Sequence, residues 1–391
     1  MVTTSSKSAS YFPALTGIRA VAALLVFFFH AVPEAPADVQ IIWLKWPGRL
    51  AQQGYIGVSI FFVLSGFLIA IRNFDRVQLT GIWFKHYVQN RFARIYPLYF
   101  LLTAFTFAVM LVHPFHTWYE WSSTSSSGDK AVIILANLTL VRAFFNEFVF
   151  VGVPTAWTLT IEETFYLSAP FLLLGLKHSI RWFYTYPVLF ILSGLLLVLV
   201  CERWLPHYGL MANLRFMLSE TFFGRCVEFL IGIGLAWWVH RRPMAQGVSR
   251  GGSTTLLGCA GIVSCLLLLL WLERSLPINS WVAFSINRLL TNIMLPLPIA
   301  IMLWGLLYER TWLRRILESK TAQLLGKSSY AFYLIHLGTL DTIFSVYVTG
   351  NVVARLCAYT LLAILLYKWV EHPLHKLLRA PSEKRPLVVS V

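Results

Sequence analysis

The stretch LTGIRAVAALLVFFFHA at residues 15–31 decides the class of fold. From residue 20 to residue 29 it is apolar on every side of a helix, and a second run of this kind, SCLLLLLWL, occupies residues 264–272. Strands of an outer-membrane barrel would instead alternate apolar and polar residues in segments of about ten. A helix crosses a bilayer with about 20 mostly apolar residues, so these runs predict transmembrane helices.

The composition of the whole chain agrees with this interpretation. Of the 391 residues, 58% are hydrophobic and 13% are charged, whereas soluble domains are about 25% charged. These values exclude a soluble globular protein, a disordered chain, collagen and a disulfide scaffold. The five cysteines are scattered, mostly in apolar runs and without metal-ligand spacing, so we expect neither a disulfide nor a metal site.

Hydrophobic windows predict an all-α, polytopic bundle of about ten spans in one membrane domain at 1–375, followed by a short basic tail at 376–391. A shorter apolar stretch at 131–146 is interrupted by Asn137 and Arg142, and we expect an interfacial or re-entrant helix there. The predicted spans are 14–33, 54–72, 97–113, 156–177, 182–201, 222–239, 254–272, 289–308, 330–349 and 352–371. The first is expected to be a retained span rather than a signal peptide.

The net charge of +15 would suggest nucleic acid as the partner of a soluble protein. Here it is better explained by the excess of Lys and Arg in cytoplasmic loops, and we expect no nucleic acid partner. The loops after the second, fourth, sixth and eighth spans carry the positive charges, which predicts that both termini are cytoplasmic. These residues are Arg72, Arg76, Lys85, Arg91 and Arg94; Lys177 and Arg181; Arg241, Arg242 and Arg250; and Arg310, Arg314, Arg315, Lys320 and Lys327.

Ionisable residues inside spans indicate function because they cost several kcal/mol in lipid. Arg19 and His30 are eleven residues apart, so they face the same way on a helix, about 16 Å apart. An anionic ligand held at Arg19 could extend along this stripe to His30. The alternative is that Arg19 reaches lipid headgroups and that His30 is hydrated at the far interface.

Glu162 and Glu163 lie about as deep in the fourth span as His30 does in the first. A carboxylate can orient an imidazole and stabilise its protonated form, so we expect His30 and Glu162 to form a proton-transfer pair. A structural ion pair with Arg142 or Arg19 is the alternative. His336 falls in the cytoplasmic half of the predicted ninth span, where a hydrogen-bonded core residue is the commoner interpretation.

Two further patterns leave alternatives open. Arg91 and Arg94 lie on adjacent turns before a span that begins with proline, where they could clamp phosphates of an anionic cofactor or anchor headgroups. Gly54, Gly57 and Gly66 permit close packing of helices or close approach of a ligand.

With these residues identified, the sequence resembles acyltransferase family 3, the integral membrane enzymes that include O-antigen and exopolysaccharide O-acetylases. The resemblance covers nearly the whole chain, and its motifs follow in the order of the family. They are Arg19-x10-His30, GYIGVSIFFVLSGFLI at 54–69, R-x-x-R-I-x-P-x-Y at 91–99, W-x-L-x-x-E-x-x-F-Y at 157–166, GRCVEFLIGIGLAW at 224–237, LGKSSYAFYLIH at 325–336 and VEHP at 370–373.

The resemblance implies transfer of an acyl group, most often acetyl from acetyl-CoA, to a hydroxyl of a sugar or glycosylated acceptor at the bacterial inner membrane. Arg19, Arg91 and Arg94 are expected to bind acyl-CoA, and His30 with Glu162 to catalyse transfer. His30 would act either as the base for the acceptor hydroxyl or as the group that takes the acyl first. Trp157, Tyr166 and His336 are expected to contact the substrate.

Departures from the family pattern are small. Thr158 replaces the usual serine and Thr164 a frequent glutamine, and the short tail leaves no room for the esterase-like domain of some members. No G-x-S-x-G motif occurs, so a serine nucleophile is not expected. A proton-coupled transporter or flippase is the competing interpretation, since such carriers also use intramembrane Arg, His and Glu. Oligomeric state cannot be predicted from this pattern.

Overall fold

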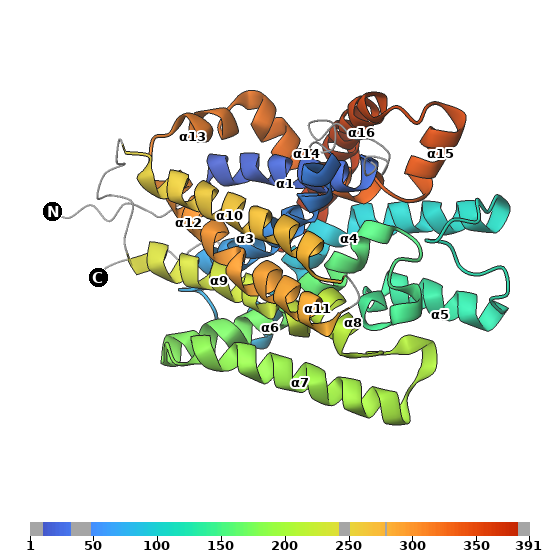
Figure 1. Cartoon of the computed structure of the whole chain (residues 1–391), viewed down its shortest axis with the longest axis horizontal. Coiled ribbons are helices and arrows are strands. Elements are labelled where there is room, and N and C mark those ends of the chain that lie inside the picture. The colour runs from blue at the N-terminus through green and yellow to red at the C-terminus, as the bar shows by residue number, and fades with distance from the viewer. Residues whose placement is uncertain (1–10, 33–47, 242–250, 278–279, 382–391) are drawn as a thin grey trace.

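The computed structural model describes residues 11–32, 48–241, 251–277 and 280–381. In these ranges the chain is a bundle of helices without a strand, and most of the long helices run side by side (Figure 1). The α-helices are α1 (Pro13–Ala31), α3 (Ile56–Asn73), α4 (Gly81–Val112), α5 (Ser127–Leu138), α6 (Trp157–His178), α7 (Trp182–Trp204), α8 (Leu214–Glu220), α9 (Phe222–Arg241), α10 (Ser253–Ser275), α11 (Trp281–Leu289), α12 (Pro296–Tyr308), α13 (Trp312–Leu317), α14 (Lys320–Ile335), α15 (Thr339–Tyr347), α16 (Val352–Leu366) and α17 (His372–Leu378).

Shorter elements connect these helices. The 3-10 turns are η1 (Gln53–Tyr55), η2 (Arg142–Phe144), η3 (Asn146–Phe148), η4 (Pro154–Ala156) and η5 (His207–Gly209), and two π-helical turns are η7 (Leu290–Met294) and η8 (Tyr367–Glu371). Among the described residues, nine helical segments are long and apolar enough to cross a membrane. Their outer faces expose large apolar side chains, as α7 does with Leu192, Leu196 and Leu199. Such a surface requires lipid around it, so the protein is a multi-pass integral membrane protein.

Glycines let the central helices approach at backbone distance. A Cβ on Gly66 of α3 would collide with the backbone carbonyl of Phe229 in α9, and a Cβ on Gly232 of α9 would collide with that of Val63 in α3. Gly54 and Gly57 meet the backbone of α1 in the same way. Close packing is therefore the role of these glycines, because small residues let helices associate without help from the hydrophobic effect.

The two ends of the bundle differ. At one end, the start of α1 meets α14, where Gln323 Nε2 donates to the carbonyl of Pro13 at 2.7 Å. The C-terminal α17 is at this end too, with Gln89 Nε2 of α4 donating to the carbonyl of Leu378 at 3.0 Å. The opposite end carries α5 and α15 (Figure 1). The predicted domain boundary at residue 375 falls inside α17, and the rest of the tail beyond residue 381 is outside the described residues.

The predicted ninth span, 330–349, is wrong. The chain is helical from Lys320 to Ile335 and again from Thr339 to Tyr347, and it breaks at Gly338, whose φ of +101° is accessible to glycine. The predicted window excluded the first half of α14 because Lys320, Gln323 and Lys327 lower its hydropathy. Consequently His336 caps the far end of α14, and not the end where the positive loops lie.

Two other predictions need correction. The third span does not begin at Pro97, since α4 is one helix of 32 residues that continues through this proline. Arg91 and Arg94 therefore lie inside a membrane-length helix rather than in a loop. The stretch 131–146 forms only the end of α5, and turns follow it.

Buried Arg142 organises those turns. It is 0% exposed, and its guanidinium donates to Asn137 Oδ1 at 2.7 Å and to the carbonyls of Val151, Val153 and Pro154. The Arg142 guanidinium thus makes its hydrogen bonds to Asn137 and to backbone carbonyls, and none to Glu162. The predicted alternative of an ion pair between Glu162 and Arg142 is therefore wrong.

We predict that Gly66→Ala lowers the free energy of unfolding by about 1–3 kcal/mol, the usual cost of overpacking, because the added methyl collides with the carbonyl of Phe229. Gly81→Ala is the matched control, since nothing lies within 4 Å of a Cβ at Gly81. The measurement is the thermal unfolding midpoint in detergent. Equal midpoints for the two variants would contradict the close approach of α3 and α9.

Candidate active site

Two cavities lie inside the bundle. We name the first the arginine cavity, about 320 Å³ in volume, which is lined by Arg19, Arg72, Arg91, Arg94, Ser65, Glu162, Tyr166 and His375 among others. We name the second the histidine cavity, about 540 Å³, which is lined by His30, Trp118, Phe150, Trp157, Glu220, Arg225, Glu273 and Arg288 among others. Val58 and Tyr333 line both cavities. The two spaces therefore adjoin at these two side chains.

Three helices direct arginines into the arginine cavity. Arg19 comes from α1, Arg72 from the last turn of α3, and Arg91 and Arg94 from α4. A further space of about 140 Å³ shares Arg19, Arg72 and Arg94 with it and is also lined by Lys327. Positive charge is thus concentrated at the end of the bundle that holds the start of α1.

Only part of this charge is neutralised inside the protein. Arg94 Nη1 forms an ion pair with Glu371 Oε1 at 2.7 Å, in which Arg94 is 30% exposed and Glu371 2%. The Nε atoms of Arg19 and Arg91 are buried and have no hydrogen-bond partner. Donors that are buried and unpaired are costly, so these two nitrogen atoms are available to a ligand in the cavity.

Glu162 belongs to the arginine cavity. Its Oε1 accepts a hydrogen bond from Ser65 Oγ at 3.3 Å, and its Oε2 accepts one from Tyr166 Oη at 2.7 Å. Of the two adjacent carboxylates, Glu162 lines this cavity and Glu163 does not. The predicted contact between Glu162 and His30 is wrong, because His30 lines the other cavity.

The partner of His30 is His336. His30 Nδ1 lies 3.1 Å from His336 Nε2, and His336 Nδ1 lies 3.3 Å from the carbonyl of Phe332. A carbonyl can only accept, so for two neutral rings His336 Nδ1 carries its proton and His336 Nε2 accepts from His30 Nδ1. This leaves His30 Nε2 unprotonated, which is the state a base or nucleophile requires.

His336 itself is 0% exposed and lines neither cavity. It therefore lies outside both cavities, away from the predicted substrate contact, and its side chain contacts His30. The contact between His30 and His336 was not predicted because the predicted ninth span begins about ten residues after the start of α14. The parallel packing of α1 and α14 brings the two histidines together, since Thr16 meets Gly326 at one end and His30 meets His336 at the other.

Aromatic and charged side chains line the rest of the histidine cavity. Trp157, predicted to contact the substrate, lies on its wall, as do Trp118 and Phe150. Thr158 stands where the family usually has serine, and it retains the hydroxyl group. Its Oγ1 lies 3.2 Å from the Oη of Tyr333, which lines both cavities. Tyr166, the other predicted aromatic contact, faces the arginine cavity instead.

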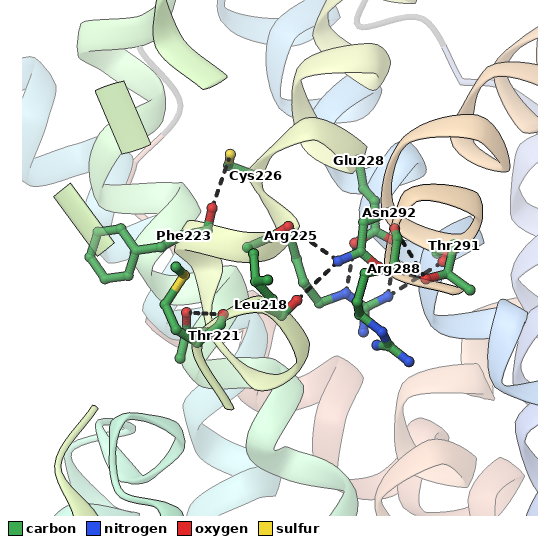
Figure 2. Close-up of polar contacts among 12 residues, drawn as sticks. Leu218, Thr221, Phe223, Arg225, Cys226, Glu228, Arg288, Thr291 and Asn292 are labelled. Carbon is green, nitrogen blue, oxygen red and sulfur yellow. Dashed lines mark hydrogen bonds and ion pairs between the residues drawn. The ribbon is translucent and has the colours of Figure 1, made fainter. Parts of the chain in front are cut away.

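Arg225 and Glu228 form a buried ion pair beside this cavity. Arg225 Nε and Nη2 lie 2.7 and 2.8 Å from the two carboxylate oxygens of Glu228. Figure 2 shows this pair on α9 next to Arg288 of α11 and Asn292 of η7, and Asn292 Nδ2 donates to the carbonyls of Leu218 and Gly224. The hydrogen bonds join α9 to the α11–η7 segment.

Sequence reasoning did not assign roles to Arg72, Glu220, Arg225, Glu273 and Arg288. For two of these residues, Arg72 and Arg225, the sequence does contain a spacing that could have identified them. Arg72 follows Ser65 by seven residues on one helix face, and Arg225 and Glu228 are oppositely charged at i and i+3 in an apolar segment. Glu220, Glu273 and Arg288 come from three different helices, so no local spacing could have grouped them.

The comparisons with known proteins agree with the sequence motifs. The family model described as an acyltransferase domain matches residues 12–367. The O-acetyltransferases OatA of Staphylococcus aureus strains NCTC 8325 and COL are each 23% identical to this chain over 393 residues, which is 94% of this chain and 58% of the relative. The chain spans about three fifths of the length of these relatives. No solved structure matches.

The family match begins at the first turn of α1 and ends in η8, so it includes every residue that lines the two cavities except His375 of α17. The predicted family is confirmed: the chain belongs to the acyltransferase domain family of membrane proteins.

Proposed function

We propose that this protein transfers an acetyl group from acetyl-CoA to a hydroxyl of a carbohydrate or glycosylated acceptor. The observation that carries the proposal is the pair of adjoining cavities, one with unpaired arginine donors and one lined by His30, whose Nδ1 lies 3.1 Å from His336 Nε2. The relatives named O-acetyltransferase OatA support this reaction.

The arginine cavity suits the anionic donor. Its arginines offer bidentate donors for the phosphates of CoA, and Tyr87 and Tyr166 flank Arg91 with ring centres 5.9 and 6.0 Å from its Cζ. Ser65 and Tyr166 hold the Glu162 carboxyl in the cavity that Arg19 also lines. Glu162 is thus proposed as a positioning residue rather than a catalytic partner of His30.

The acyl end of the donor would reach His30 past Val58 and Tyr333, the two side chains that both cavities share. His30 Nε2 removes the proton of the acceptor hydroxyl, and the hydroxyl oxygen attacks the thioester carbonyl. The carbon–sulfur bond breaks, and the leaving thiolate takes up the proton from His30. A route in which His30 Nε2 takes the acyl group first uses the same atom and remains a second form of the proposal.

The positions of the Lys and Arg residues indicate which end of the bundle faces the cytoplasm. The positive residues Arg72, Lys177, Arg241 and Lys320 lie at the same ends of α3, α6, α9 and α14 as the arginine cavity. By the rule that cytoplasmic loops are rich in Lys and Arg, this end is proposed to face the cytoplasm of a bacterial plasma membrane. CoA would then enter from inside, and the acceptor would reach His30 from outside.

We predict that His30→Ala lowers transfer from acetyl-CoA by about 10²–10⁴-fold, the usual contribution of a general base, without loss of donor binding. His178→Ala is the matched control, since His178 is exposed at the end of α6. The measurement is transfer or hydrolysis of radiolabelled acetyl-CoA by purified protein, with label on the protein scored after quenching. A folded His30→Ala protein with full activity would remove His30 from the mechanism.

His336→Phe is predicted to lower kcat by less than His30→Ala does and to leave the KM for acetyl-CoA unchanged, because it removes the acceptor for His30 Nδ1 but no substrate contact. His336→Gln, which can restore an acceptor, is expected to recover part of the rate. A rise in KM with unchanged kcat would indicate direct substrate contact instead.

Arg19→Lys is predicted to weaken acetyl-CoA binding by about tenfold or more, because a point charge does not replace the fork of donors and a charged hydrogen bond contributes about 1.5–3 kcal/mol. Arg203→Lys, at an exposed site on α7, is the control. Calorimetry in detergent measures the affinity. No CoA binding by the wild-type protein would favour the transporter interpretation.

A further inference from the structure

Acyl transfer from a thioester needs one group that the mechanism above does not supply. When a nucleophile attacks the thioester carbonyl, the carbonyl oxygen becomes negatively charged, and enzymes stabilise this oxyanion with hydrogen-bond donors that are fixed in advance. His30 moves the proton and the arginines bind phosphates, so another donor is required. It must lie where the thioester comes within reach of His30, at the boundary between the two cavities.

Tyr333 places a hydroxyl group at this boundary. Among the described residues, Val58 and Tyr333 are the two that line both cavities, and the side chain of Val58 is apolar. Tyr333 lies on α14 three residues before His336, and the centres of their rings are 5.7 Å apart. One helix therefore carries both the partner of His30 and a hydroxyl beside the route of the thioester.

Packing fixes the position of the Tyr333 ring. The residue is 7% exposed, and its ring lies edge-on to Phe61 of α3, with the ring centres 5.7 Å apart. A donor that is already held in place does not have to be reoriented when charge develops on the substrate. Tyr333 therefore meets the geometric requirement for stabilising an oxyanion.

The hydrogen bonds around Tyr333 direct its proton to a weak acceptor. Thr158 Oγ1 donates to the carbonyl of Thr155 at 3.1 Å, and a hydroxyl has only one proton to donate. In the contact of 3.2 Å between Thr158 Oγ1 and Tyr333 Oη, Tyr333 is therefore the donor. Hydrogen bonds between two oxygens are most often about 2.7–2.8 Å long. This long bond can be exchanged for one to a charged oxygen, which is shorter and stronger.

Other hydroxyls in the arginine cavity already have strong acceptors. Ser65 and Tyr166 donate to the Glu162 carboxyl, and Tyr330 Oη donates to a backbone carbonyl at 2.8 Å. Tyr333 differs from them because its acceptor is a neutral hydroxyl. Its proton is thus the one most readily redirected to a substrate.

We propose that Tyr333 is a catalytic residue whose hydroxyl donates a hydrogen bond to the thioester oxygen as that oxygen becomes an oxyanion. This inference rests on the proposed function. The acceptor oxygen bonds to the carbonyl carbon, and an electron pair of the C=O bond moves onto the carbonyl oxygen. Tyr333 keeps its proton and stabilises this charge. The pair then re-forms the C=O bond, the carbon–sulfur bond breaks, and the leaving thiolate takes the proton held by His30.

Tyr333→Phe tests the proposal because it removes the hydroxyl and keeps the ring. The kcat for acetyl transfer is expected to fall by about 10²–10³-fold, while the KM for acetyl-CoA changes by less than about threefold, since the bond forms fully only in the transition state. Tyr99→Phe is the matched control, because Tyr99 is buried, donates to the carbonyl of Asn137 at 2.9 Å and lines neither cavity. It is expected to keep the wild-type kcat.

An unreactive donor separates catalysis from binding. In dethia-acetyl-CoA a methylene group replaces the sulfur, so no thiolate can leave. Calorimetry is expected to give the same Kd for this analogue with the wild-type protein and with Tyr333→Phe. A folded Tyr333→Phe protein with the wild-type kcat would overturn the proposal. A loss of analogue binding as large as the loss of rate would overturn it too, because Tyr333 would then bind the donor.

Thr158 is a positioning residue in this account, since its Oγ1 holds the Tyr333 hydroxyl. Thr158→Val keeps the shape of the side chain and removes the acceptor, and it is expected to lower kcat about fivefold, the effect of one neutral hydrogen bond. Thr158→Ser, which retains the hydroxyl, is expected to keep the wild-type kcat. Equal kcat values for these two variants would contradict the positioning role.

The results also separate this inference from the proposed function. Wild-type protein that neither binds nor turns over acetyl-CoA would contradict the proposed function itself. Turnover by the wild-type protein together with full activity of Tyr333→Phe would contradict only the role of Tyr333.

Discussion

The structure depends on enclosing charged side chains inside a bundle whose outer surface faces lipid. An arginine, histidine or glutamate costs several kcal/mol in hydrocarbon, and here such residues line cavities or pair with one another. Arg94 pairs with Glu371 and Arg225 with Glu228, whereas Arg142 satisfies backbone carbonyls. Glycine contacts such as that of Gly66 with α9 bring the helices close enough to exclude lipid from these groups.

The different linings of the two adjoining cavities give the bundle its direction. The arginine cavity collects donors for an anion, and the histidine cavity collects aromatic faces and carboxylates around His30. A donor and an acceptor of different chemistry can therefore approach one catalytic nitrogen from opposite ends. In the proposed mechanism the buried His336 accepts from His30 Nδ1 and leaves His30 Nε2 free to act, so the packing of α14 against α1 sets the tautomer.

Much of this could be predicted from the sequence because membrane spans are long and apolar. The spacing of Arg19 and His30 predicted their places toward opposite ends of α1, and the anion site at Arg91 and Arg94 stays a prediction, with both residues lining the arginine cavity. Depth alone could not identify partners: Glu162 and His30 are at comparable depth, yet Glu162 faces Ser65 and Tyr166. The first half of α14 is polar, so hydropathy did not identify this helix at its true position. His336 was therefore not expected at the end of α14 where it contacts His30. Glu220, Glu273 and Arg288 meet only through tertiary packing.

The central claim is that donor and acceptor enter from opposite ends of the bundle and meet at His30. The most direct test places the protein in vesicles, with its orientation determined by labelling a Lys177→Cys variant with a membrane-impermeant reagent. Acetyl-CoA is supplied on the side of Lys177 and the sugar acceptor on one side at a time. The account predicts acetylated product when the acceptor is on the side opposite Lys177. Product formed only when donor and acceptor share one side would contradict it.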